Sequence, residues 1–239
     1  MLQWLKDKKL ICFDLDGTLL DSVGIWNQVD AALILQLGGQ HIDFVTIQSD
    51  RDRQLTKFKH HTDPYLEYCG FLNKKYTFHK EKNDVKTERY KISQYFLDHV
   101  VELKPDAELW LQALQQQGFV LALTTTTSQN NLRRYQENNA AIYKKLNFND
   151  VFSLILTREN VQNIKPDPEI YLTALNHFQI SAEQCVIFED SLIGVEAAKH
   201  AGIDVIAIYD HWSHTDWPSI QAQADGVFYQ YTDLLQSKN

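Results

Sequence analysis

The chain has 239 residues, and its hydrophobic content of 44% with 12% aromatic residues suffices for one large or two modest packed domains. A net charge of -8 argues against a protein that binds nucleic acid or a membrane surface, because both of these are themselves negatively charged. The first nine residues lack the apolar stretch of a signal peptide, no apolar run is long enough to cross a bilayer, and three cysteines are too few for a disulfide framework. We therefore expect a cytoplasmic location and no nucleic-acid or membrane partner.

The first predicted element is a short buried strand over residues 10–13, which ends directly before two aspartates. Asp14 and Asp16 flank Leu15, so the alternation of a strand would direct both carboxylates to the same side. Two like charges this close destabilise each other unless a cation or a shared proton lies between them. The pattern predicts a magnesium site in which one aspartate attacks as a nucleophile and the other transfers protons. A plain Asp-Gly turn ending at Gly17 is the alternative.

Residues after this strand, up to about 103, carry a different pattern. Two apolar stripes with helical spacing, from Trp26 to Leu37 and from Ile92 to Leu103, enclose a polar stretch of weak periodicity. An insertion with helical ends directly after the first strand is typical of a lid beside an active site. The alternative is a set of surface helices on the same domain.

Strand and helix signals alternate in the rest of the chain. We expect helices over residues 105–118 and 128–146, from 167 to 178, and after 190, together with strands over residues 119–123, 151–156, 185–188 and 205–209 and a short edge strand at 227–229. Such alternation implies an α/β fold, a parallel sheet with helices on both faces. The site of such a sheet lies at the carboxyl ends of its strands, which is where the sequence has Asp14, Asp16, Thr125, Lys165, Glu189 and Asp190.

Four separated motifs carry a family resemblance. They are the runs from Asp14 to Leu19, from Leu121 to Thr125, from Lys165 to Tyr171 and from Val186 to Ser191. In this order they resemble the motifs of the haloacid dehalogenase superfamily, in the branch of β-phosphoglucomutase and phosphoglycolate phosphatase. The resemblance implies a Rossmann-like core over residues 1–20 and 104–239, and an inserted α-helical cap domain over residues 21–103.

The resemblance also implies a role for each acidic residue. Asp14 would be the nucleophile that forms a phosphoaspartate, and Asp16 would protonate the leaving oxygen and then deprotonate water. Mg²⁺ would be the cofactor, held by Asp14, by the backbone carbonyl of Asp16 and by Asp190. Glu189 would be either a further ligand or a neighbour of the ligands.

The resemblance further implies that a threonine hydroxyl and a lysine ammonium group bind the phosphoryl group. Thr125 ends the second motif and would donate to a phosphoryl oxygen, although Thr126 in the same run of four threonines could share this role. Lys165 would anchor the phosphoryl group and stabilise the Asp14 carboxylate. Each of these side chains would be unremarkable alone, since lysines are mostly exposed and threonines are common at strand ends.

Asp16 also discriminates between two reactions of the superfamily, dehalogenation and phosphoryl transfer. A halide leaves without a proton, so an acid at this position indicates phosphoryl chemistry and not dehalogenation. We expect a magnesium-dependent phosphatase that acts on a small phosphorylated metabolite, as a monomer or weak homodimer. A sugar-phosphate mutase and a catalytically idle binding scaffold are the alternatives. By their location alone, some residues of the insertion are candidates for substrate contact: Arg51, Arg53, His60, His61 and Tyr65.

Overall fold

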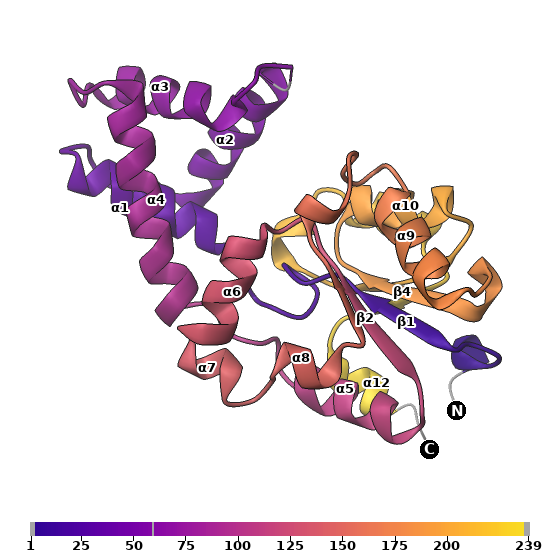
Figure 1. Ribbon diagram of the computed structural model, residues 1–239. Coiled ribbons are helices and arrows are strands. Elements are labelled where there is room, and N and C mark those ends of the chain that lie inside the picture. The colour runs from indigo at the N-terminus through magenta and orange to yellow at the C-terminus, as the bar shows by residue number, and fades with distance from the viewer. Residues whose placement is uncertain (1–2, 59, 237–239) are drawn as a thin grey trace. The chain divides into compact units, whose positions relative to one another are not determined.

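A computed structural model describes residues 3–58 and 60–236 of the chain. The structure divides into two compact units, one formed by residues 1–23 with 101–239 and the other by residues 24–100 (Figure 1). The first unit contains a sheet covered by helices, and the second is entirely helical in its described part. Each unit has its own apolar core.

The sheet of the first unit has six parallel strands. In the order β3-β2-β1-β4-β5-β6, every neighbouring pair runs parallel, which confirms the predicted fold class. β1 lies in the middle, and its last residue, Phe13, pairs with Leu123 on one side and Phe188 on the other. The strands are β1 (Leu10–Phe13), β2 (Val120–Thr124), β3 (Leu154–Leu156), β4 (Cys185–Glu189), β5 (Asp204–Ile208) and β6 (Gly226–Phe228).

Helices cover both faces of this sheet (Figure 1). One face packs on α9 (Glu169–Phe178) and α10 (Leu192–His200), through a cluster that includes Cys12 and Ile187. On the other face lie α5 (Ala107–Gln116) and α12 (Tyr231–Gln236). The remaining helices of this unit are short: α6 (Gln129–Glu137), α7 (Ala140–Tyr143), α8 (Phe148–Val151) and α11 (Trp217–Gln223).

Three local predictions differ from the structure. The predicted helix over residues 128–146 is broken, because the side chain of the buried Asn139 accepts hydrogen bonds from the backbone of Ala141 and Ile142 and so caps a new helix, α7. The predicted strand over 151–156 is shorter, since α8 occupies its first residue. The predicted helical stripe ending at Leu103 also stops early, because α4 ends at His99.

The two segments that connect the units run side by side in the first unit. Leu20 and Leu103 form an antiparallel bridge, the amide of Asp21 donates to the carbonyl of Glu102, and the amide of Lys104 donates to the carbonyl of Leu19. This short ladder fixes where the helical unit leaves the sheet unit and where the chain returns.

The helical unit contains α1 (Ile25–Gln36), α2 (Phe44–Lys57), α3 (Pro64–Tyr76) and α4 (Lys82–His99). Asp30 is fully buried in this unit, and its carboxylate accepts hydrogen bonds from Arg51, Arg89 and the hydroxyl of Tyr68. Arg51, a candidate for substrate contact by location, is therefore engaged in an internal ion pair. A buried carboxylate needs such partners, because an unpaired charge is costly in an apolar core.

None of the helices in the described part of the chain combines the length and the apolar composition that crossing a bilayer requires.

Candidate active site

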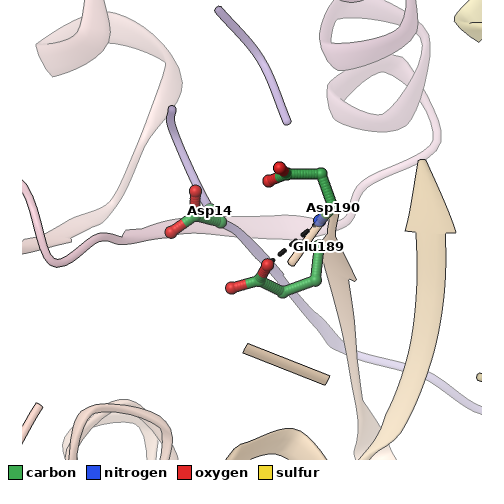
Figure 2. Close-up of side chains that lie close together, drawn as sticks. All are labelled: Asp14, Glu189 and Asp190. Atoms are coloured by element: carbon green, nitrogen blue, oxygen red, sulfur yellow. Dashed lines mark hydrogen bonds between the residues drawn. The ribbon is translucent and has the colours of Figure 1, made fainter. Parts of the chain in front are cut away.

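Three carboxylates gather at the carboxyl edge of the sheet (Figure 2). Asp14 directly follows β1, while Glu189 is the last residue of β4 and Asp190 follows it. Because β1 and β4 are neighbours, one carboxylate oxygen from each of the three residues lies within 4.8 Å of the others. The sheet thus produces the acidic cluster, since each side chain comes from the end of a fully buried strand.

Lys165 lies among these acids. Its ammonium Nζ donates to Oδ1 of Asp14 at 2.6 Å, to Oε1 of Glu189 at 2.7 Å and to the carbonyl of Thr124 at 2.9 Å. The side chain is 2% exposed, so all three protons of the ammonium group are used inside the protein. Charge-assisted hydrogen bonds of this length are the strong ones, and they fix the position of the Asp14 carboxylate.

Both carboxylate oxygens of Glu189 already accept several hydrogen bonds. Oε1 accepts from Lys165 and from the hydroxyl of Tyr171 at 3.1 Å, while Oε2 accepts from the amide of Asp190 and from the amide and hydroxyl of Ser191. A carboxylate has about four acceptor positions. The geometry therefore suits Glu189 to hold Lys165 and the start of α10 in place, and leaves little capacity for a metal ion.

Two glycines let these acids reach their positions. A Cβ on Gly17 would lie 2.2 Å from Oδ2 of Asp190, and its φ of +88° is one that other residues rarely adopt. A Cβ on Gly194, in the first turn of α10, would lie 1.9 Å from Oε1 of Glu189. Replacing either glycine would displace a carboxylate. Thr18 also helps to orient Asp190, because its hydroxyl donates to Oδ1 of Asp190 at 2.9 Å.

Asp16 makes different contacts from the acidic cluster. Its Oδ1 accepts from the hydroxyl of Ser22 at 2.6 Å and from the hydroxyl of Tyr135 at 3.2 Å, and its Oδ2 accepts from the hydroxyl of Thr127. Sequence reasoning missed all three of these partners. Tyr135 lies on α6, and the signal that could have found it is a tyrosine on the buried side of a helix, since a buried hydroxyl needs a partner.

The threonine run after β2 divides into buried and partly exposed members. Thr125 is buried, and its hydroxyl oxygen accepts a hydrogen bond from the amide of Thr127 at 3.0 Å, which leaves its proton free to donate. Thr126 is partly exposed. Both remain candidates for phosphate binding, and Thr124 is the member whose carbonyl accepts from Lys165.

The electrostatics of the cluster reflect its burial. Burial raises the pKa of Asp14 to about 7, against the lowering effect of the Lys165 ammonium. Burial, followed by the charge of Glu189, also raises the pKa of Asp190 well above its ordinary value. Burial disfavours the ammonium form of Lys165, but the neighbouring carboxylates outweigh that effect and raise its pKa. The cluster therefore has a deficit of positive charge.

The donor set fits a hard divalent cation. Oxygen ligands from carboxylates are what Mg²⁺ prefers, and the buried carboxylates of Asp14 and Asp190 supply two of them at the same edge of the sheet. A cation between them would reduce the repulsion that raises both pKa values. Carboxylates in this arrangement, with a lysine alongside, can perform nucleophilic attack on an electrophilic group that carries negative charge.

Known proteins that resemble this chain in sequence and in structure include hydrolases, several of them phosphatases by name. The family model of haloacid dehalogenase-like hydrolases matches residues 11–208. A phosphorylated carbohydrates phosphatase from Thermotoga maritima is 26% identical over 82% of each chain, and a phosphoglycolate phosphatase from Vibrio cholerae is 27% identical over 97% of each. Among solved structures, CbbY from Rhodobacter sphaeroides in complex with phosphate has a TM-score of 0.69 at 22% identity, covering 95% of this chain and 96% of that one.

The family model spans most of the chain and includes the ends of β1, β2 and β4. The chain therefore belongs to the haloacid dehalogenase-like hydrolase family. The family resemblance inferred from the four sequence motifs is thus confirmed.

Proposed function

We propose that this hydrolase is a magnesium-dependent phosphatase that cleaves a small phosphorylated metabolite through a phosphoaspartate on Asp14. The observation that carries the proposal is the contact of Lys165 with Asp14, next to Asp190, at the carboxyl edge of the sheet. Relatives named for phosphorylated carbohydrates and for phosphoglycolate support this class of substrate.

Asp14 and Asp190 are the residues that would hold Mg²⁺, together with the backbone carbonyl of Asp16. Glu189 would hold Lys165 and the start of α10 in place without binding the ion, because its oxygens already accept five hydrogen bonds from Lys165, Tyr171, Asp190 and Ser191. When bound, the ion supplies positive charge that offsets the repulsion between the attacking carboxylate and the phosphate dianion.

In the first step, a carboxylate oxygen of Asp14 attacks phosphorus, and the bond from phosphorus to the ester oxygen breaks. The departing oxygen takes a proton from Asp16. Lys165 and the hydroxyl of Thr125, with Thr126 as the second candidate, bind the phosphoryl oxygens. Lys165 also holds the attacking oxygen in place, which lowers the entropic part of the barrier.

In the second step, water attacks the phosphorus of the phosphoaspartate. Asp16 takes a proton from this water, the bond from phosphorus to Asp14 breaks, and inorganic phosphate leaves. Asp14 is then a carboxylate again and Asp16 carries a proton, which is the state that starts the next cycle. The helical unit takes the role of a cap that selects the substrate.

The test is magnesium-dependent phosphate release from a panel of esters: 2-phosphoglycolate, hexose 1- and 6-phosphates and p-nitrophenyl phosphate. We expect release that stops with a chelator and falls by at least about a thousandfold in Asp14→Asn, because the amide is not a nucleophile. Release that persists at the wild-type rate in Asp14→Asn would contradict the proposal.

A sugar-phosphate mutase is the second candidate. A Thermotoga maritima structure provisionally assigned as a β-phosphoglucomutase supports it, with a TM-score of 0.73 over 97% of this chain. A mutase would interconvert glucose 1-phosphate and glucose 6-phosphate faster than it releases phosphate. A chain that performs neither reaction on this panel would be a binding scaffold.

A further inference from the structure

Asp16 is held by three hydroxyl groups from three separate segments. Ser22 lies in the segment between β1 and α1, Thr127 lies in the segment after β2, and Tyr135 lies on α6. Asp16 itself lies in a loop and is partly exposed. A carboxylate in such a position can adopt several rotamers, so its orientation depends on these donors.

Of the three donors, Tyr135 is the one that lies on a helix. It is 1% exposed, and on the same helix Leu132 is buried three residues earlier, so the packing of α6 sets the place of the ring. Its hydroxyl donates a hydrogen bond to Oδ1 of Asp16, and a tyrosine hydroxyl ordinarily carries its proton at neutral pH.

We propose that Tyr135 is a positioning residue for the proton transfers of Asp16, an inference that rests on the proposed phosphatase function. The contact from a rigid ring to Oδ1 of Asp16, 3.2 Å long, holds the carboxyl group where it can reach the departing oxygen. Tyr135 has no part in the attack by Asp14, because none of its described contacts involves the acidic cluster. Its loss should weaken only the steps in which Asp16 moves a proton.

Esters with different leaving groups show whether a substitution affects proton transfer by Asp16 or the attack by Asp14. The alkyl oxygen of 2-phosphoglycolate or glucose 6-phosphate needs a proton as it leaves, whereas p-nitrophenolate is stable as an anion. The ratio kcat/KM reports on the steps up to formation of the phosphoenzyme. Tyr135→Phe should lower kcat/KM for the better of the two alkyl esters by about 10- to 100-fold, which is part of the usual contribution of general acid catalysis. For p-nitrophenyl phosphate the change should stay below about threefold, because little proton transfer is needed.

Two controls distinguish positioning from general damage. Tyr143→Phe removes the hydroxyl of an exposed tyrosine on the neighbouring helix α7. It should leave kcat/KM unchanged for both the alkyl ester and p-nitrophenyl phosphate. Tyr135→Phe in an Asp16→Asn background should cause no further loss, because a residue that acts through Asp16 has no effect once the acid is gone. Equal losses on both kinds of ester, or a full additional loss in the double variant, would overturn the proposal.

A crystal structure of Tyr135→Phe gives a readout that needs no turnover. The proposal predicts that the Asp16 carboxylate changes rotamer or occupies two orientations. A carboxylate that stays fixed on Ser22 and Thr127 would overturn it. If the wild type hydrolyses no ester of the panel, the phosphatase proposal fails, and this structure still decides whether Tyr135 positions Asp16.

Discussion

Nζ of Lys165 lies 2.7 Å from Oε1 of Glu189, and both side chains are almost completely buried. The lysine comes from the segment before α9, and the glutamate ends β4. Because the same ammonium group also contacts Asp14, this ion pair links the proposed nucleophile to the end of a neighbouring strand. The position of the nucleophile therefore depends on a charge network and not on Asp14 alone.

Replacing the lysine of this network should have two effects. Lys165→Met should lower kcat by about 100- to 1000-fold, because a positive charge beside the phosphoryl group is lost. It should also lower the free energy of unfolding by about 3–5 kcal/mol, because two buried carboxylates lose their partner. Urea unfolding and steady-state kinetics test both effects.

The matched control is Lys199→Met. Lys199 pairs with Asp225 on the surface, where an ion pair contributes at most about 1 kcal/mol. Equal effects of the two substitutions on stability and on kcat would contradict the assigned role of Lys165.

The raised pKa of Asp14 predicts how stability depends on pH without metal. Its pKa is about 7 in the folded chain against 3.8 for an unperturbed aspartate, so the folded state binds more protons between these values. The free energy of unfolding of the wild type therefore falls as pH rises through this window. Asp14→Asn removes this pH-dependent penalty, so in a chelator the Tm of the variant minus that of the wild type should be a few degrees larger at pH 8 than at pH 4.

Differential scanning fluorimetry in a chelator at several pH values measures this difference. Asp216→Asn, which alters an exposed aspartate of the same unit, is the control and should show no such trend. A Tm difference that is the same at pH 4 and pH 8 would mean that Asp14 is not a destabilised buried charge.

Gly17 offers a test of the metal site through backbone geometry. Gly17→Ala places a Cβ against Oδ2 of Asp190, so we expect Mg²⁺ affinity to fall by at least about tenfold, as when the groups that orient metal ligands are disturbed. Calorimetric titration with Mg²⁺ measures the affinity directly.

Gly118→Ala is the matched control for this substitution. Gly118 also has a positive φ, +85°, but a Cβ there would meet nothing within 4 Å. Both variants lose the conformational freedom of glycine, and only Gly17→Ala disturbs Asp190. Equal Mg²⁺ affinity in the two variants would exclude Asp190 as a ligand.

The helical unit should depend on its buried ion pairs. Arg89 donates to both oxygens of the fully buried Asp30 and lies against the rings of Trp26, Tyr65 and Tyr68. Arg89→Met should lower the free energy of unfolding of this unit by about 3–5 kcal/mol, because a buried ion pair is broken and the Asp30 carboxyl group loses a main hydrogen-bond partner. Urea unfolding followed by circular dichroism tests this in the whole chain.

An exposed ion pair of the same helix provides the comparison. Lys91 pairs with Glu88 on the surface of α4, so Lys91→Met should change stability by less than about 1 kcal/mol. A loss of that small size in Arg89→Met would show that the buried cluster is not needed for the fold of this unit.

The sequence predicts the sheet and its acidic edge well for a physical reason. Runs of buried apolar residues define parallel strands, and polar residues directly after them must gather at one edge, as Asp14 and Asp190 do. Lys165 needed the family resemblance as well, because nothing in its own segment indicates burial.

Other features depend on tertiary contacts that local patterns do not encode. The side-chain amide of Asn139 donates to the carbonyl of Val101, far away in sequence, and this contact accompanies the break after α6. Asp30 and Arg89 are 59 residues apart, and a charged residue in a helix ordinarily predicts a solvated face. Tyr135 lies in α6, which forms the first part of the helix predicted over residues 128–146, but its partner is set by how α6 packs.

The central claim is that Asp14 carries the phosphoryl group between the two steps. Asp16→Asn should slow hydrolysis of the intermediate, so this variant, mixed with p-nitrophenyl phosphate and Mg²⁺ and quenched in acid, is suited to trapping it. Peptide mass spectrometry should then find one phosphoryl group on Asp14, removable by hydroxylamine. Phosphorylation of another residue, or phosphate release by Asp14→Asn at the wild-type rate, would contradict the account.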